Sequence, residues 1–331
     1  MTLIKNEYDF SISIPDDINV SWNIIQEDSL LDIDTYLKTL SIKNDLSLVV
    51  LWGAERRIPV TDPRIKKLNL FKKSIPNPML LVNGSYCPPS KNLIEFAYAN
   101  IDIFKYASSR FFRHLVPSTD LRTHKFLFAS SKDYLSRRYL LQALLNNNIS
   151  GHVAYKCDVV YHEKEFYPND LDEISQAGKT IDHLLPIQGF DDLAHFPSIP
   201  ESVINSSLVS IVMETYFNGP VYFSEKIYNS MLFNHLFIYL GPPNSLKHLQ
   251  EQGFKTFGHV IDESYDLIED DARRLFAVKT SMINFLLKPI EELRLIHKQN
   301  QHILDHNRNL VLSYDISDAV TKELQQAIQD Q

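Results

Sequence analysis

Apolar runs rich in β-branched and aromatic residues recur along the chain, and stretches with helical periodicity separate them. Short continuous runs of this kind predict strands that are buried on both faces, because neither face carries a polar series. The predicted strands are residues 46–51, 79–82, 125–129, 152–155, 208–213 and 235–240. The predicted helices between them are residues 90–106, 136–146 and 225–233.

Alternating strands and helices predict an α/β protein with parallel sheets of the doubly wound kind. From residue 264 onward the pattern is mostly helical, with helices expected at 270–287, 290–309 and 316–328. A chain of 331 residues has room for two domains, and the stretch around Pro117 predicts a linker between them. The predicted parts are an N-terminal domain over 1–120, a second domain over 121–285 and C-terminal helices over 286–331.

The composition is that of a folded globular protein, with 44% hydrophobic and 22% charged residues. Cys87 and Cys157 are too few for a disulfide framework and lack metal-ligand spacing, which is typical of a reducing compartment. No apolar run approaches the roughly 18–20 residues of a membrane span, and the N-terminus lacks the pattern of a signal peptide. We therefore expect a cytoplasmic protein without a membrane span.

The net charge of −8 is distributed unevenly along the chain. Residues 52–138 hold 16 Lys and Arg against 6 Asp and Glu, a local balance of +10 in an otherwise acidic protein. Such a segment can form a surface for an anionic partner, either nucleotide phosphates or nucleic acid. The alternative is that these charges are scattered over solvated faces.

The stretch 208–266 predicts a strand, a polar loop, a helix, a second strand and a glycine turn. Ser224, Glu225 and Lys226 stand where the loop enters the helix. Free N–H groups and the helix dipole attract phosphate there, Lys226 adds a full positive charge, and Glu225 can accept hydrogen bonds from two ribose hydroxyls. In the alternative interpretation Ser224 is only an N-cap and the Glu–Lys pair a solvated first turn.

This order of elements resembles the donor-binding segment of the α-1,3-fucosyltransferase family. There a strand ends in Phe-Glu-Asn, and a loop leads to Tyr-x-Thr-Glu-Lys at a helix start. The matching residues here are Met213, Glu214 and Thr215, followed by Tyr222, Phe223, Ser224, Glu225 and Lys226. The resemblance implies that Tyr222 faces the nucleoside, Glu225 holds the ribose, Lys226 holds the diphosphate and Glu214 shapes the site beneath the sugar. Thr215 replaces the family's Asn, which leaves the nucleotide base open.

A second patch resembles the same family upstream. Fucosyltransferases have a strand ending in Ser-Asn, then an Arg seven residues before a Leu; here Ser130 and Ser131 are followed by Arg137, seven residues before Leu144. The resemblance implies that Arg137, with Arg138 beside it, binds the diphosphate, since an Arg fork neutralises a leaving phosphate without a metal. A surface Arg pair on an amphipathic helix is the alternative.

The resemblance as a whole implies two Rossmann-like lobes of the GT-B type, with the C-terminal helices bracing the lobes. It implies an inverting, metal-independent glycosyltransferase whose co-substrate is a nucleoside-diphosphate sugar and which needs no cofactor. Residues 253–266 also resemble open reading frames of bacteriophages and large viruses.

A transferase of this kind needs a carboxylate base to deprotonate the acceptor hydroxyl. Fucosyltransferases carry theirs in a Gly-Glu-Asn after a first-lobe strand, whereas here the comparable strand ends in Asn83, Gly84 and Ser85. Glu95 and Asp102, on the predicted helix 90–106, are the candidates for the base, and plain surface is the alternative for both. The acidic residues between 262 and 271 are interpreted as helix caps rather than as a metal site.

Three functions stay open: glycosyl transfer, non-catalytic binding of a nucleotide sugar, and nucleic-acid binding by the segment 52–138. The first and third combine if the acceptor is a hydroxymethylated base of bacteriophage DNA, with a glycan as the alternative acceptor. Aromatic side chains accompany the basic ones, as stacking on an extruded base requires. They are Phe71, Tyr106, Phe111 and Phe112.

Overall fold

The computed structural model describes backbone and side chains for residues 122–130, 134–155, 199–214, 221 and 223–313. It describes the backbone alone for Asp133, for the strand Val160–Tyr161 and for six strands within the first hundred residues. The chain forms two compact units, and each is described by itself. Unit 1 is Met1–Lys105 with Tyr314–Gln331, and unit 2 is Tyr106–Ser313.

Unit 1 contains a parallel four-stranded sheet whose strands follow one another in chain order. The strands are β3 (Val20–Ile24), β4 (Leu48–Trp52), β5 (Met79–Asn83) and β6 (Ile94–Ala97). A separate antiparallel pair joins β1 (Thr2–Lys5) and β2 (Ser11–Ile14). The sequence predicted β4 and β5 but not β1, β2 or β3.

The predicted helix 90–106 is wrong at β6, where Glu95 lies in a strand and is paired with Leu81 of β5. The large apolar residues Ile94 and Phe96 alternate with Glu95 and Ala97, which is the periodicity of a strand. These four residues lie within a longer stretch that has helical periodicity. Pairing with β5 stabilises the strand, because tertiary contacts override a weak local preference.

Unit 2 contains a parallel sheet in the order β12-β11-β7-β9. The strands are β7 (His124–Ser130), β9 (His152–Tyr155), β11 (Ser207–Met213) and β12 (Leu236–Leu240). All residues of β11 and β12 are buried, as expected of apolar strands covered on both faces. The α/β class with a parallel four-stranded sheet is thus confirmed.

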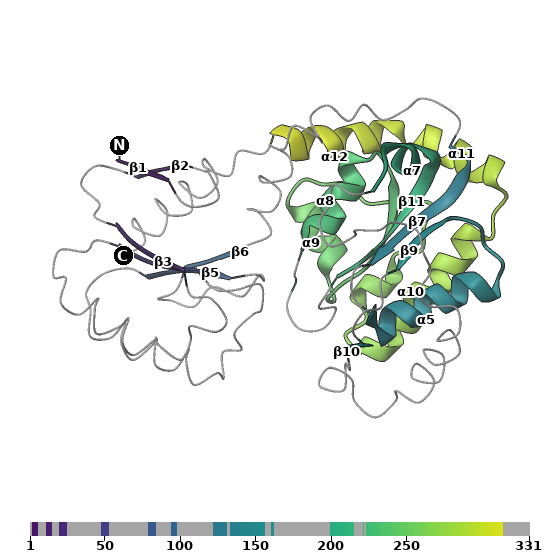
Figure 1. Ribbon diagram of the computed structural model, residues 1–331, viewed down its shortest axis with the longest axis horizontal. Helices are drawn as coiled ribbons and strands as arrows, with labels where there is room; N and C mark the ends of the chain where they lie inside the picture. Colours follow the sequence, from purple (N-terminus) through teal and green to yellow (C-terminus); the bar gives the residue numbers. More distant parts are fainter. Residues whose placement is uncertain are drawn as a thin grey trace. The chain divides into compact units, whose positions relative to one another are not determined.

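The strand order reverses between β7 and β11. The chain leaves β7 for β9 on one side of the sheet, and leaves β11 for β12 on the other. A right-handed connection on each side requires helices on opposite faces, and Figure 1 shows α5 and α8 on opposite sides of the strands. The carboxyl ends of β7 and β11 therefore border a topological switch point, where open α/β sheets bind ligands.

Helices cover both faces of the unit 2 sheet. Helix α8 (Glu225–Leu232) packs with α12 (Gln301–Ser313) on one face, and α5 (Leu135–Asn146) packs with α10 (Asp271–Leu286) on the other (Figure 1). The remaining elements are β8 (Asp133–Tyr134), β10 (Val160–Tyr161), α7 (Glu201–Ser206), α9 (Ser245–Glu251), η4 (Ser264–Leu267) and α11 (Ile290–Gln299).

The predicted helix 290–309 is divided into α11 and α12 at Asn300. The Asn300 side chain donates to the carbonyl oxygen of Ile296 at 2.9 Å and lies 2.7 Å from the His259 ring. Such local bonds compete with the helical ladder and explain the break. The predicted helix 316–328 lies outside the described residues. No helix in the described part of the chain has the length and apolar character to cross a membrane.

Candidate functional site

Polar side chains gather at the carboxyl ends of β7 and β11, where the strand order reverses. Ser130 is the last residue of β7, and Glu214 directly follows β11. Helices α5 and α8 begin at Leu135 and Glu225, shortly after these strands. Their N-terminal N–H groups give this edge of the sheet a positive potential.

Ser224 is the N-cap of α8, as one interpretation of the sequence predicted. Its hydroxyl accepts a hydrogen bond from the backbone N–H of Lys226 at 3.3 Å. Glu225 and Lys226 form the first turn of the helix, with side chains 24% and 23% exposed. These two residues therefore present the charges of the cluster that a ligand can reach from solvent.

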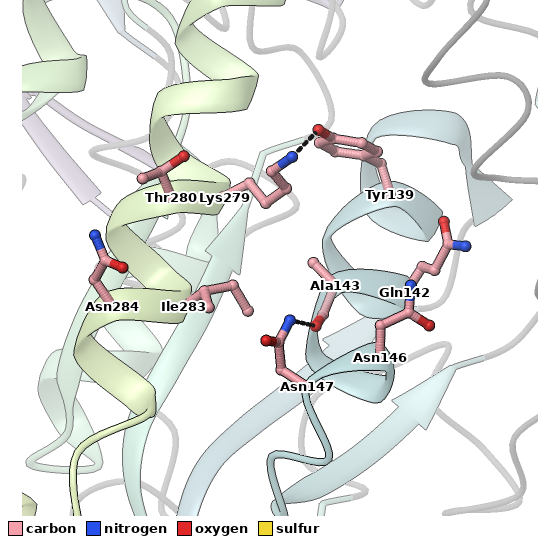
Figure 2. A pocket seen from close by; sticks show the side chains of 9 residues that line it. All are labelled: Tyr139, Gln142, Ala143, Asn146, Asn147, Lys279, Thr280, Ile283 and Asn284. Carbon is pink, nitrogen blue, oxygen red and sulfur yellow. Dashed lines mark hydrogen bonds between the residues drawn. The ribbon is translucent and has the colours of Figure 1, made fainter.

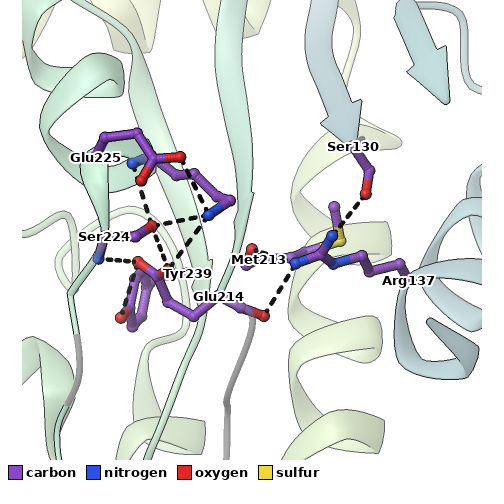
Figure 3. Close-up of polar contacts among 8 residues, drawn as sticks. Ser130, Arg137, Met213, Glu214, Ser224, Glu225 and Tyr239 are labelled. Carbon is purple, nitrogen blue, oxygen red and sulfur yellow. Dashed lines mark hydrogen bonds and ion pairs between the residues drawn. The ribbon is translucent and has the colours of Figure 1, made fainter. Parts of the chain in front are cut away.

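Glu214 lies behind that turn with its carboxylate fully buried (Figure 3). The carboxylate accepts hydrogen bonds from the Ser224 N–H at 3.0 Å, from the Ser224 hydroxyl and from the Tyr239 hydroxyl at 3.4 Å. Its Oε2 atom lies 3.9 Å from the Lys226 Nζ. Burial raises the pKa of Glu214, and Lys226 and the Ser224 hydrogen bonds only partly oppose this.

Lys226 links the members of the cluster. Its Nζ lies 3.3 Å from Oε1 of Glu225 and donates to the Ser224 hydroxyl at 3.0 Å. Burial acts to raise the pKa of Glu225, but Lys226, a backbone hydrogen bond and Arg137 outweigh it, so the pKa is lowered. Glu225 is therefore held as a carboxylate beside an ammonium group, while the pKa of Glu214 moves the other way.

Arg137, in the first turn of α5, ties the two central strands together (Figure 3). Its guanidinium donates to the Ser130 hydroxyl at 2.8 Å and to the carbonyl oxygens of Met213 and Glu214 at 3.4 and 3.3 Å. It also stacks over the Tyr134 ring at 4.7 Å. Arg137 is 2% exposed and its neighbour Arg138 6%, so the alternative of a surface Arg pair is wrong.

Two hollows lie near these elements. A small one of about 30 Å³ lies between α8 and the strands β7 and β11, and Lys226 and Asn229 line it. A larger one of about 400 Å³ lies between α5 and α10 (Figure 2), where Lys279 donates to the Tyr139 hydroxyl. Amide side chains rim this larger hollow, but only the small one adjoins the polar cluster.

The acidic residues between 262 and 271 act mostly as backbone acceptors. Asp270 caps α10 by accepting from the Arg273 N–H, which confirms the capping interpretation for this residue. Asp266 accepts from the N–H groups of Leu246 and Lys247 and so caps α9, while Asp271 pairs with Arg274 at 2.5 Å. Among the residues that the structure describes, no group of three or more His, Cys, Asp or Glu could hold a metal ion.

The structure thus brings together five residues that the sequence singled out. They are Arg137, Glu214, Ser224, Glu225 and Lys226. Tyr222 and Asp102 lie outside the described residues, and Glu95 is described by its backbone alone in unit 1. Sequence reasoning missed Tyr239 and Asn229, which stand in a buried strand and on a buried helix face without any motif to mark them.

Comparisons with protein-family models, curated proteins and solved structures found no match to this chain.

Proposed function

We propose that the protein is a glycosyltransferase that moves a sugar from a nucleoside diphosphate to a hydroxyl acceptor. The observation that carries the proposal is the cluster at the start of α8. Lys226 and the helix N-terminus stand there at the switch point of the parallel sheet β12-β11-β7-β9, next to Glu225. A helix N-terminus with a lysine suits a diphosphate, and a carboxylate beside it suits the vicinal hydroxyls of ribose.

Each residue of the cluster has a role in this proposal. Lys226 neutralises the diphosphate as it leaves with the electron pair of the bond to the anomeric carbon. Glu225 orients the ribose, and Glu214 fixes Ser224 and thereby the N–H groups of the first turn. Arg137 holds the strand ends that carry these residues.

The acceptor oxygen forms the new bond to the anomeric carbon and loses its proton to a carboxylate base. Glu95 and Asp102 stay the predicted candidates for that base. The proposal extends to two lobes of the GT-B type, with unit 2 as the donor lobe.

The alternative in another class is a protein that binds a nucleotide sugar without turning it over. Both functions use the cluster at α8, so binding alone does not separate them. Release of the nucleoside diphosphate in the presence of an acceptor supports the transferase, while stable binding without release supports the alternative.

The test is thermal unfolding with a panel of GDP-, UDP- and dTDP-linked sugars. A ligand present at a hundred times its Kd stabilises the fold by about 2.7 kcal/mol. Lys226→Ala is expected to weaken binding of the best ligand by about 1.5–3 kcal/mol, the range for a charge-assisted hydrogen bond.

The matched control is Lys247→Ala, because Lys247 also stands in the first turn of a helix that follows a strand of this sheet. Lys247→Ala is expected to leave the affinity unchanged. Equal affinity of wild type and Lys226→Ala would remove the cluster from the proposal. Activity is also expected to survive EDTA, and complete loss restored by Mg²⁺ would contradict a metal-independent reaction.

DNA is the acceptor that the charge distribution favours, because residues 52–138 carry a balance of +10. Each phosphate contact contributes about −0.9 to the slope of log K against log salt. Replacing Lys66 and Lys67 together by Ala is expected to flatten that slope by about one to two units and to leave nucleotide-sugar affinity intact. Wild-type protein that does not bind DNA even at low salt would exclude this acceptor and favour a glycan.

A further inference from the structure

The side chain of Asn229 stands out on α8 because its amide makes no hydrogen bond. Asn229 is 1% exposed, and neither its Nδ2 nor its Oδ1 has a partner in the described part of the chain. Burial of an unpaired amide is costly, and native proteins pair the great majority of such groups. A residue kept in this state is a candidate for binding something from outside the chain.

Asn229 lines the small cavity between α8 and the strands β7 and β11. Lys226, Asn229 and Ser230 line the cavity from α8, while Ala129 and Met213 line it from the strands. The volume of about 30 Å³ exceeds the roughly 10–15 Å³ that one water molecule needs. The cavity therefore has room for one group of the size of a hydroxyl, and not for a nucleotide base.

The other polar groups around the cavity are already bonded within the protein. The Ser230 hydroxyl donates to the carbonyl oxygen of Ile227 at 2.6 Å, and the Ser210 hydroxyl lies 2.8 Å from Nδ1 of His235. Asn229 comes three residues after Lys226, so the two side chains share one face of the helix. A ligand held by Lys226 can thus extend a neighbouring group towards the Asn229 amide.

We propose that Asn229 binds a hydroxyl group of the ligand whose diphosphate Lys226 holds, that is, a ribose or sugar hydroxyl of a nucleotide sugar. A hydroxyl both donates and accepts, and a carboxamide offers the complementary acceptor and donor. The inference rests on the proposed function and adds to it a neutral contact that selects for a polyol next to the phosphates.

Asn229→Leu tests this role, because Leu has a similar shape and no polar atoms. Loss of a buried, unpaired amide costs the free protein nothing, so the melting temperature without ligand is expected to equal or exceed that of wild type. The Kd of the best-bound nucleotide sugar is expected to rise about five- to tenfold, the effect of one hydrogen bond. Inorganic pyrophosphate, which lacks a hydroxyl-bearing carbon frame, is expected to bind both proteins equally.

Ser230→Ala is the matched control, since it lines the same cavity but its hydroxyl is already bonded; its Kd is expected to equal that of wild type. Asn229→Ala replaces Asn229→Leu if the Leu variant does not fold. An unchanged Kd in the Asn229 variants, together with a lowered melting temperature, would overturn the inference. It would indicate that the amide binds a buried water molecule instead of the ligand. Wild-type protein without affinity for any nucleotide sugar would instead overturn the proposed function, and this ligand with it.

Discussion

The polar groups at the two ends of the unit 2 sheet differ in their hydrogen-bond partners and in their exposure to solvent. At the amino end, the Arg122 guanidinium donates to the carbonyl oxygens of Ile204, Ser207 and Phe233. Arg122 is 4% exposed, and burial lowers its pKa to about 10, so it stays protonated at neutral pH. All three of these hydrogen bonds end on backbone carbonyls of the protein itself.

Two histidines complete the amino end. The His235 ring lies 2.8 Å from the Ser210 hydroxyl through Nδ1 and 2.8 Å from the Ile204 carbonyl through Nε2. His297 donates from Nε2 to the Asn234 carbonyl at 2.8 Å. Burial lowers the pKa of both imidazoles, so both are neutral groups closed off by internal partners.

At the carboxyl end, by contrast, Lys226 and Glu225 keep about a quarter of their side chains exposed, and the Asn229 amide has no described partner. The polar cluster at the amino end of this sheet therefore makes its hydrogen bonds within the protein. The cluster at the carboxyl end is partly exposed and can be reached by a ligand. The difference agrees with the proposal that the carboxyl end binds the ligand, while the internal hydrogen bonds of the amino end contribute to stability.

The largest effect is expected for Arg122→Met. Three carbonyl oxygens lose a charged donor in a buried place, so unfolding free energy is expected to fall by at least about 3 kcal/mol in a denaturant titration. Arg294→Met is the control, because this Arg donates to the carbonyl of Arg122 but is 23% exposed, and a loss of about 1 kcal/mol is expected. Equal losses of unfolding free energy in the two variants would contradict the view that the buried hydrogen bonds of Arg122 stabilise the amino end.

The second prediction concerns acid. Burial, and then Arg122, lower the pKa of His297 from 6.5 to about 4. The unfolded chain therefore binds a proton below pH 6.5 that the folded chain rejects, so stability is lost as the pH falls from 6.5 towards 4. His297 alone is expected to contribute about 2–3 kcal/mol to the loss at pH 4.5.

His297→Gln is expected to remove this share of the dependence, because a Gln side chain can still donate to the Asn234 carbonyl and does not titrate. The share of His235, whose pKa burial also lowers, is expected to remain. Unfolding free energies at pH 7 and pH 4.5 measure the effect. His306→Gln is the control at a half-buried histidine whose ring contacts the Gly253 carbonyl at 2.8 Å. A His297→Gln variant with the full acid sensitivity of wild type would exclude His297 as its source.

The four strands of the main unit 2 sheet could be predicted from the sequence to within one residue at either end, whereas the two-residue strands β8 and β10 were not predicted. Their runs of Val, Ile, Leu and Phe are dense because both faces are buried, and that density does not depend on the rest of the fold. β6 could not be predicted, since its four residues become a strand only by pairing with β5. At Asn300 a tertiary contact with His259 accompanies the local bond to the Ile296 carbonyl, and this contact could not be predicted from the sequence.

The candidate site could be predicted in part for the same reason. Ser224, Glu225 and Lys226 form a local pattern at a helix start, which a sequence displays directly. The chemistry of Asn229 lies in what its neighbours leave unpaired, and that of Arg122 in carbonyls up to 111 positions away. Neither property belongs to a sequence window.

The smallest effect is expected for Glu214→Gln, and it tests the carboxyl end by the sign of its pH dependence. Burial raises the pKa of Glu214, so its contribution to stability is present below the unfolded value of 4.5 and is lost as the pH rises through the folded value. Gln resembles the protonated form and can still accept from the Ser224 N–H. The melting temperature of the variant minus that of wild type is therefore expected to increase as the pH rises above 4.5.

Glu225→Gln is the control with the opposite sign. The pKa of Glu225 is lowered on balance, because Lys226 and Arg137 outweigh its burial, so its contribution is present above 4.5 and is lost in acid. This variant is expected to be less stable than wild type at pH 7 and to approach wild type as the pH falls. Glu214→Gln also removes a carboxylate 3.9 Å from Lys226, so pyrophosphate affinity is expected to rise at any pH where Glu214 is ionised. Parallel pH curves for the two variants would show that the two carboxylates share one environment, and the distinction between a buried support and an open ligand contact would be lost.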